Sequence, residues 1–311
     1  MNQFHHVSVL LEESVQALAV RPEGTYIDGT LGGAGHAGQV ARRLTTGRLI
    51  GIDRDETALA AAAERLSPYL SRVTLVHGNF QDLGRILGEL GIARADGILL
   101  DLGVSSPQLD QQDRGFSYMA DAPLDMRMDR SAGLTAGQVV NTWPEEELRR
   151  ILFDYGEERY AARIAGAICR RRETRPVKTT LELAEIIRRA MPPQALREKQ
   201  HPAKRSFQAI RIAVNDELGA VERVMPQAIG CLAPGGRLAV ITFHSLEDRI
   251  VKNAMQAAAR GCTCPPEFPV CVCGRKPKVR LITKKPVTAG AAELAENPRA
   301  RSAKLRVCEK L

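Results

Sequence analysis

The sequence predicts an α/β protein, in which a doubly wound, mostly parallel sheet of seven strands carries an inserted all-helical domain. Apolar strand-like runs alternate with helix-patterned segments from residue 25 to residue 101, which is typical of a parallel sheet. Residues 113–212 then show helical spacing without clear strands, and the alternation resumes afterwards. We therefore expect one domain formed by residues 1–112 and 213–311, and an inserted helical domain formed by residues 113–212.

The first half of the chain supplies four strands and the helices between them. Residues 7–18 carry apolar positions at helical spacing. Strands are predicted at 25–27, 49–52, 72–76 and 96–100, with helices at 36–44, after Asp55, and at 81–90. Asp55 is suited to cap the second of these helices, and Gly91 is suited to end the third.

After Asp101 the pattern changes. Residues 102–129 are rich in Gly, Ser, Pro and Asp and are too long for an ordinary strand–helix connection, which favours a functional loop. Helices are predicted after Pro144, over 157–172, and from a capping box of Thr179 and Glu182 up to Pro192. A helix over 212–232, a strand over 237–242, a helix over 246–259 and two late strands at 279–283 and 303–308 complete the sheet.

The bulk composition excludes some classes of protein and favours others. No apolar run approaches the ~18–20 residues that span a bilayer, so no membrane partner is expected. The N-terminus lacks the pattern of a signal peptide, and seven cysteines in such a chain predict reduced thiols in the cytoplasm. The sequence does not decide the oligomeric state, and a homodimer is one possibility.

The positive charge is concentrated in one block. Residues 159–211 hold 14 Lys and Arg against 4 Asp and Glu, whereas the whole chain has a net charge of +8. This imbalance favours a polyanionic partner, such as RNA or DNA. The alternative is a solvated helical surface with salt bridges.

A glycine-dense turn is the strongest local signal for a ligand site. The first predicted strand ends at Asp28, followed by Gly29-Thr30-Leu31-Gly32-Gly33-Ala34-Gly35-His36. Glycines allow the backbone close to a nucleotide cofactor, and Asp53, at the tip of the second strand, is placed to accept hydrogen bonds from ribose hydroxyls. The alternative is that Asp28 and Asp53 cap helices and do not contact a ligand.

Two features favour S-adenosylmethionine over a dinucleotide. An acid before the glycines suits the cationic methionine end of that cofactor better than a pyrophosphate, and the late strand pair replaces a second βαβ half. Phe80, just after the third strand, could lie against an adenine ring or be a core aromatic. Asp101 closes a buried strand, where an acid without a partner is costly, which favours a role in the site.

Several longer segments resemble one family. The chain is similar, over essentially its whole length, to the ribosomal RNA small subunit methyltransferase H family, also called MraW. The segments that carry the resemblance are residues 6–11, 28–36, 101–110, 114–117, 124–128, 155–159, 243–249 and 296–302.

The resemblance implies a class I methyltransferase fold with a helical insert that recognises RNA. It implies N4-methylation of a cytidine in the decoding, P-site region of 16S rRNA within the 30S subunit, with S-adenosylmethionine as cofactor. The cofactor contacts implied by the matching segments are Gly33, Ala34, Gly35, His36, Asp53, Phe80, Asp101 and Gln108.

The reaction itself suggests where catalytic groups belong. The N4 lone pair of cytosine is delocalised into the ring, and a hydrogen-bond acceptor at the amine would localise it. Asp101, or the backbone of residues 103–105, is the expected acceptor, although Asp101-Leu102-Gly103-Val104 departs from the Asn/Asp-Pro-Pro-aromatic motif of many amino-methyltransferases. His244 could accept a proton or could fix the turn after the fifth strand.

Four cysteines cluster late in the chain, and their role is left open. Cys262, Cys264, Cys271 and Cys273 could bind a tetrahedral Zn²⁺, but C-x-C pairs are less specific than C-x₂-C pairs, so a metal-free surface loop is expected. Cys169, Cys231 and Cys308 are expected in the core.

Two other functions compete with methyl transfer. An NAD-dependent oxidoreductase would give the basic insert no role. A non-catalytic rRNA-binding assembly factor would keep the fold without the activity, but the intact acids and glycines of the turn argue against such decay.

Overall fold

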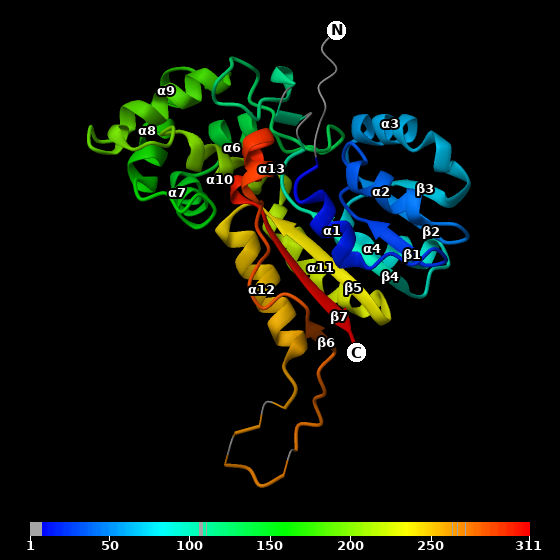
Figure 1. Ribbon diagram of the computed structural model, residues 1–311. Helices are drawn as coiled ribbons and strands as arrows, with labels where there is room; N and C mark the ends of the chain where they lie inside the picture. The colour runs from blue at the N-terminus through cyan, green and yellow to red at the C-terminus, as the bar shows by residue number, and fades with distance from the viewer. Residues whose placement is uncertain (1–7, 106–107, 110, 263, 266, 271) are drawn as a thin grey trace. The chain divides into compact units, whose positions relative to one another are not determined.

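The computed structural model describes residues 8–105, 108–109, 111–262, 264–265, 267–270 and 272–311. These residues form two compact units (Figure 1). The first holds the described residues up to Gly103 together with Leu218–Leu311, and the second is Val104–Glu217. The expected insert, residues 113–212, falls within the second unit. Each unit is described by itself below.

The first unit is built on a seven-stranded sheet with the order β3-β2-β1-β4-β5-β7-β6. β1 to β5 are parallel, whereas β7 is antiparallel to both β5 and β6. The predicted α/β class with a mostly parallel sheet is therefore confirmed. The strands are β1 (Thr25–Asp28), β2 (Arg48–Asp53), β3 (Val73–His77), β4 (Ala95–Asp101), β5 (Leu232–Thr242), β6 (Val279–Leu281) and β7 (Lys304–Lys310).

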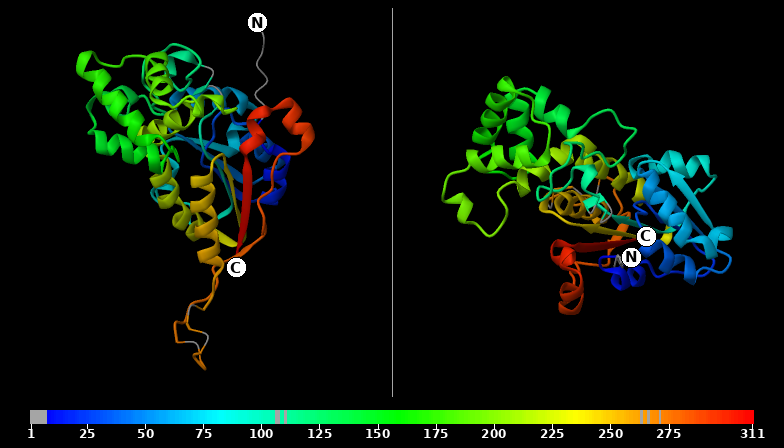
Figure 2. Two further views of the ribbon diagram at one scale, coloured as in Figure 1. Left: turned by 90° about the vertical axis from the view of Figure 1, so that its left-hand side faces the viewer. Right: turned by 90° about the horizontal axis from the view of Figure 1, so that it is seen from above.

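Helices cover both faces of this sheet. On one face, buried side chains of α4, α11 and α12 pack with Ile27, Ile98 and Val240. On the other face, α1, α2 and α3 pack with Tyr26, Leu99 and Ile241 (Figure 2). The helices of this unit are α1 (Leu11–Leu18), α2 (Gly35–Arg43), α3 (Glu56–Arg65), α4 (Leu83–Glu89), α11 (Glu217–Cys231), α12 (Ser245–Ala259) and α13 (Ala291–Glu296), with 3₁₀ turns at Ser67–Arg72, Phe80–Asp82 and Pro298–Ser302.

The second unit is helical and has a core of its own, formed by residues such as Val139, Ile151, Ile164 and Ile187. The predicted capping box of Thr179 and Glu182 is confirmed at the start of α9. The elements are α6 (Ala136–Thr142), α7 (Glu145–Asp154), α8 (Ala161–Thr174), α9 (Thr180–Ala190) and α10 (Lys204–Asn215), with 3₁₀ turns at Gln112–Arg114 and Ala195–Arg197.

Three predicted helices differ from those of the structure. The described part of 7–10 is not helical, and α1 begins at Leu11 because Leu10 has a positive φ of 50°. The single helix predicted over 212–232 is two helices, α10 and α11, because Asp216 has a φ of 47°. Likewise α8 begins at Ala161 rather than at residue 157, since Glu157 has a φ of 48°.

Two further expectations concern burial. Cys308 is fully buried, as predicted, but Cys169 and Cys231 are only partly buried beside the core clusters. Within the described ranges, no helix is both long enough and apolar enough to cross a membrane.

Candidate active site

The glycine turn lies at the carboxyl end of β1, between the ends of two neighbouring strands. The backbone N–H of Gly29 donates to the Leu99 carbonyl of β4 at 2.9 Å, and that of Leu31 donates to the Ile52 carbonyl of β2 at 3.0 Å. Because parallel strands end at one edge of the sheet, the turn brings together the acids that end β1, β2 and β4. These acids are Asp28, Asp53 and Asp101.

The first two acids both organise the backbone around them. Asp28 accepts a hydrogen bond from the Thr30 N–H at 3.2 Å, and burial raises its pKa to about 7. Asp53 accepts from the N–H of Gly32 at 2.7 Å and from that of Asp55 at 2.9 Å, and burial raises its pKa too. Neither acid is the N-cap considered as its alternative role, because the N-caps of α2 and α3 are Ala34 and Asp55. Each carboxylate oxygen still has a lone pair for a ligand.

Asp101 is different because one of its oxygens lacks a partner. Among the described residues, Oδ1 is buried and accepts no hydrogen bond. Burial, followed by the charges of Asp28 and Glu247, raises the pKa of Asp101 well above its ordinary value. A buried carboxyl oxygen without a donor is costly, so this atom is available for a ligand.

His36 connects the turn to Asp101 and to the N-terminal segment. Its Nδ1 lies 3.8 Å from Asp101 Oδ2, and its Nε2 lies 3.1 Å from the Val9 carbonyl oxygen. The ring is buried, in the first turn of α2. His36 therefore lies beside Asp101 as well as at the predicted cofactor turn.

The small residues before His36 differ in the space around them. A Cβ added to Gly35 would lie 1.8 Å from the hydroxyl oxygen of Ser8, whereas one added to Gly33 would meet nothing within 4 Å. Ala34 is fully buried and has a φ of 56° at the N-cap of α2. The turn is thus closely packed at Gly35 and open at Gly33.

The remaining predicted cofactor contacts lie in different units. Phe80 begins a 3₁₀ turn after β3 and is partly buried against the core, and a Cβ on Gly29 would come within 3.4 Å of it. It is therefore beside the glycine turn as well as part of the core. Gln108 belongs to the second unit, where its Oε1 accepts from the Ser105 N–H at 3.1 Å. Residues 106, 107 and 110 of the predicted loop lie outside the described residues.

His244 is the N-cap residue of α12. Its Nδ1 accepts from the N–H of Glu247 at 3.5 Å, and Nε2 lies 3.2 Å from the Glu247 carboxylate. In return, Glu247 accepts from the backbone N–H groups of Phe243 and His244, which completes a capping box. Nδ1 thus serves the structural role considered for His244, whereas the buried Nε2 makes no hydrogen bond within the described residues and is available for the proton-accepting role.

Sequence reasoning missed two residues of this site. The Asp101 backbone N–H donates to Thr30 Oγ1 at 2.6 Å, which fixes the end of β4 against the turn. Glu247 is almost completely buried and contributes to the raised pKa of Asp101. Thr30 belongs to the glycine segment, and Glu247 follows His244 by three residues. Both lie in segments that the sequence had singled out, but only the fold shows that each of them is close to Asp101.

The basic block of the second unit is only partly neutralised. Glu185 pairs with Arg188 and Arg189, and Glu182 pairs with Arg175 at 3.4 Å. In contrast, three exposed cations between α9 and the start of α10 have no ion-pair partner in the part of the chain that the structure describes; they are Arg197, Lys199 and Lys204. We call these three residues the cation group.

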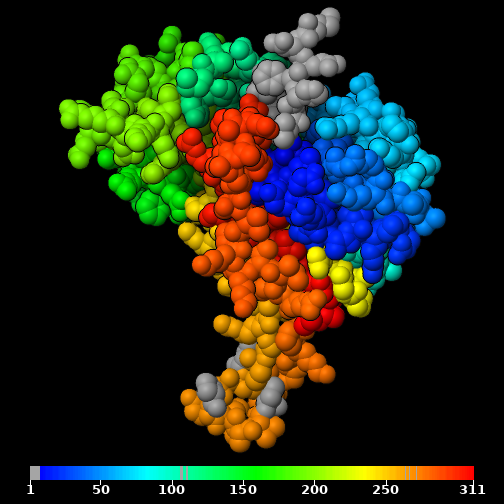
Figure 3. Space-filling model, viewed as in Figure 1, coloured from blue at the N-terminus to red at the C-terminus, as the bar shows by residue number. Residues whose placement is uncertain are grey.

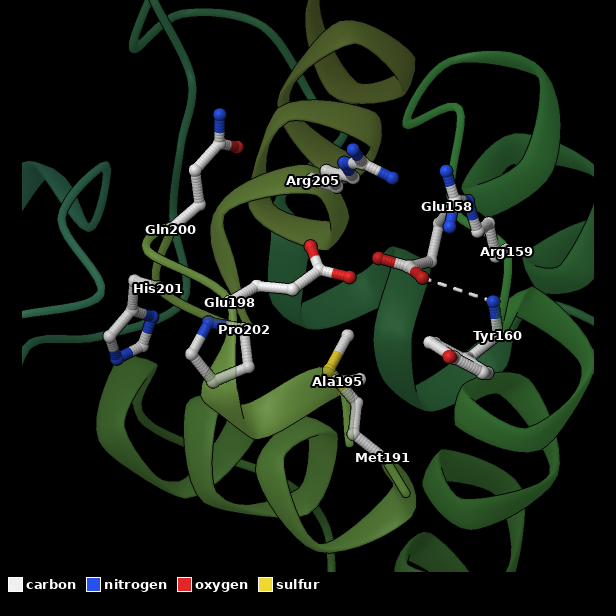
Figure 4. A pocket seen from close by; sticks show the side chains of 10 residues that line it. All are labelled: Glu158, Arg159, Tyr160, Met191, Ala195, Glu198, Gln200, His201, Pro202 and Arg205. Atoms are coloured by element: carbon white, nitrogen blue, oxygen red, sulfur yellow. Dashed lines mark hydrogen bonds between the residues drawn. The ribbon is translucent and has the colours of Figure 1, made fainter. Parts of the chain in front are cut away.

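A pocket lies close to the cation group in the same unit (Figure 4). Glu158 is buried in its wall and accepts from the Tyr160 N–H at 3.0 Å. The lining contains two acidic residues, Glu158 and Glu198, and two basic ones, Arg159 and Arg205. The pocket itself is therefore not the source of the positive charge of this unit.

Comparison with known proteins identifies the family. A sequence model of the MraW methylase family matches residues 3–311. The chain belongs to the MraW methylase family. The matched range contains every residue of the candidate site, so the MraW methylase pattern extends over the glycine turn, the strand-end acids and the helical unit alike.

Curated relatives agree with this assignment to the MraW family. Three proteins named ribosomal RNA small subunit methyltransferase H are similar over nearly their whole length. The protein from Symbiobacterium thermophilum is 59% identical over 99% of this chain and 97% of its own. That from Heliobacterium modesticaldum is 57% identical over 99% of both, and that from Geobacter sp. is 56% identical over 100% of both. MraW membership favours methyl transfer over the oxidoreductase alternative.

The MraW site fits a cationic cofactor such as S-adenosylmethionine. Two buried carboxyls with raised pKa values, Asp28 and Asp101, lie at the turn, and Asp101 Oδ1 has no donor among the described residues. A positively charged ammonium or sulfonium group would favour their ionised forms and offset their desolvation. The open side of Gly33 leaves room for a ligand against the backbone.

Proposed function

We propose that this protein methylates the exocyclic N4 of a cytidine in the decoding region of 16S rRNA, with the 30S subunit as the natural substrate. Membership in the MraW methylase family supports the reaction type, and the names of the relatives support small-subunit rRNA as the substrate. The observation that carries the choice of a nitrogen acceptor is the unpartnered, buried Oδ1 of Asp101.

S-adenosylmethionine would be held by the first unit. We assign the backbone of residues 33–36 and Asp28 to its methionine end, Asp53 to its ribose hydroxyls and Phe80 to its adenine face. The family resemblance adds Gln108 as a candidate contact. When bound, the cofactor supplies a methyl group activated by a positively charged sulfur.

Asp101 would accept the hydrogen bond of the cytosine amine. An acceptor at that position localises the nitrogen lone pair and stabilises the positive charge that develops on the amine. Burial raises the pKa of Asp101 well above its ordinary value, and a bound cation would favour its ionised form, which accepts hydrogen bonds. His36, 3.8 Å from Oδ2, would hold the carboxyl in position. His244 is the second candidate proton acceptor.

RNA would be bound by the second unit. The cation group and the remaining Arg and Lys residues of this unit would contact phosphates, which fixes position and contributes little base recognition. A cytosine in folded RNA must also leave its stack before an enzyme can act on the amine.

The decisive experiment uses methyl-labelled S-adenosylmethionine. The protein is incubated separately with 30S subunits, free 16S rRNA, 23S rRNA and tRNA, and each RNA is digested to nucleosides for mass spectrometry. We expect N4-methylcytidine in the small-subunit samples, a loss of label with Asp53→Ala, and a loss of label with Asp101→Asn that exceeds any loss of cofactor binding.

Other outcomes would replace the proposal. Label on another atom or in another RNA would contradict the proposed substrate and assign the activity to that atom or that RNA. Cofactor binding with rRNA binding but no label in any RNA would favour the assembly-factor alternative. Failure of the wild-type protein to bind S-adenosylmethionine would contradict the cofactor assignment.

A further inference from the structure

The segment between α12 and β6 has no helix or strand in its described residues, and it extends away from the rest of its unit (Figures 1, 2 and 3). Its two arms meet at the base, where the Lys278 N–H donates to the Ala258 carbonyl at 2.8 Å and Gly261 faces Pro277. Beyond this base the segment lacks a core, since Phe268, Val270 and Val272 are 50%, 70% and 74% exposed. Structureless loops longer than ~12–15 residues are uncommon in compact domains, and small segments without a core usually need a staple.

Three cysteine thiols of this segment lie close together and could supply such a cross-link. The sulfur atoms of Cys262, Cys264 and Cys273 all lie within 4.8 Å of one another, and those of Cys262 and Cys273 are 3.7 Å apart. Two thiolates on one tetrahedral zinc, each at about 2.3 Å, stand ~3.8 Å apart. A disulfide would require about 2.05 Å. The spacing of the sulfurs therefore matches a shared metal better than a covalent bond.

The local backbone and charge also suit metal-bound thiolates. The Cys264 N–H donates to the Cys262 sulfur at 3.4 Å, a contact of the kind that orients a metal ligand. Gly274, with a φ of 61°, turns the chain directly after Cys273. The flanking arms carry Arg260, Arg275 and Lys276 in the sequence, which would balance the negative charge of a zinc–thiolate centre.

We propose that Cys262, Cys264 and Cys273 bind a structural Zn²⁺ that closes this segment into a knuckle. Sulfur ligands in a tetrahedral arrangement select zinc over magnesium or calcium. Three sulfurs leave one position of the tetrahedron for a further ligand. C-x-C spacing alone favoured a metal-free loop; the convergence of three sulfurs reverses that expectation.

The test measures metal in the full-length protein. Protein expressed with zinc and purified under reducing conditions is examined by inductively coupled plasma mass spectrometry. We expect about one zinc per chain that survives a weak chelator. Cys262→Ser and Cys273→Ser should lose it, whereas Cys169→Ser, at a thiol of the helical unit, should keep it. Cobalt substitution should give the thiolate charge-transfer band and the intense visible bands of a tetrahedral centre.

A second readout follows the segment itself. Zinc should protect the Arg260–Gly261 and Arg275–Lys276 bonds from trypsin, and the protection should disappear in Cys262→Ser while the far-ultraviolet circular dichroism stays unchanged. Zinc absent from the wild-type protein, a cobalt spectrum of octahedral type, or a disulfide among these cysteines in protein purified anaerobically with zinc would each overturn the proposal.

Discussion

At the scale of single residues, Asp28 is a buried carboxyl with a pKa of about 7, so its charge changes near neutral pH. If it contacts the cationic end of S-adenosylmethionine, the bound cofactor requires the ionised form. We expect the dissociation constant to fall up to about tenfold per pH unit as the pH rises toward 7, and to level off above it. Isothermal titration calorimetry from acid to alkaline pH checks this, and Asp28→Asn should reduce the pH dependence, to which Asp53 and Asp101 also contribute.

The same carboxyl affects stability with a definite sign. Its pKa in the folded protein is higher than the ordinary value of 3.8, so the folded state binds the proton more tightly than the unfolded chain. Its contribution to stability is therefore complete below pH 3.8 and is lost as the pH rises through about 7. A cofactor-free protein whose Asp28→Asn variant showed an unchanged pH profile of unfolding would contradict this assignment.

Two glycines of the turn make a matched pair for mutation. In Gly35→Ala the new Cβ would overlap the Ser8 hydroxyl, and such overpacking costs ~1–3 kcal/mol. In Gly33→Ala the Cβ meets no neighbour, so stability should change by less than ~0.5 kcal/mol while cofactor affinity falls. Urea unfolding measures the first effect and calorimetry the second. Adding Ser8→Gly to Gly35→Ala should restore much of the stability.

The sequence could place the site residues on strand ends but could not show their relations. Asp28, Asp53 and Asp101 follow apolar runs, so their positions at one edge of a parallel sheet were predictable. The contact of His36 with Asp101 joins residues 65 positions apart and depends on strand order. The missing donor at Asp101 is a property of packing, which no spacing reveals.

At the scale of elements, substitutions at the start of α12 can distinguish the two roles considered for His244, helix capping and proton acceptance. His244→Ala should cost ~0.5–2 kcal/mol through loss of the cap. Asn is a good N-cap residue, so His244→Asn should recover most of this stability. Thermal unfolding measures the cap, and methyl transfer measured on both variants decides the role: an Asn variant that is stable and active supports capping, and one that is stable but inactive would assign catalysis to the ring.

Helix boundaries show where periodicity reaches its limit. The apolar spacing runs on from Ile210 and Ile212 into Val221 and Val224, and all four side chains are buried. A single helix was therefore predicted. The break at Asp216 is a left-handed backbone position in a non-glycine residue, which tertiary packing imposes and propensity does not indicate. The regular strands, in contrast, needed only their apolar runs and following turns.

At the scale of the whole molecule, the charge of the second unit predicts salt-dependent RNA binding. Replacing the cation group, Arg197, Lys199 and Lys204, by Ala should weaken binding to small-subunit rRNA across sequences. Each lost phosphate contact should reduce the slope of log affinity against log salt by ~0.7–0.9. Arg188→Ala and Arg189→Ala are the matched control, because both cations already pair with Glu185. Equal effects of the two sets, measured by filter binding over a salt series, would contradict a direct role of the cation group.

Fold class was the most predictable level of this protein, because alternating apolar runs and helical stripes leave few arrangements besides a parallel sheet. The antiparallel insertion of β7 between β5 and β6 was not predictable from the same pattern, since a late strand can join either edge. The sequence alone could not show which cations are available to a partner, because that depends on the ion pairs of the folded chain. Glu182 and Glu185 neutralise part of the basic block and leave the cation group exposed.

The place of β7 also bears on how a newly made chain folds. Thr242 at the end of β5 pairs with Lys304 of β7 across 62 residues, which a ribosome adds in ~3–12 s. During that interval β5 lacks its outer neighbour, whereas all residues of the second unit have already been synthesised. An open strand edge is a template for pairing with other chains. The nascent protein is thus most exposed to aggregation in the seconds before β7 emerges.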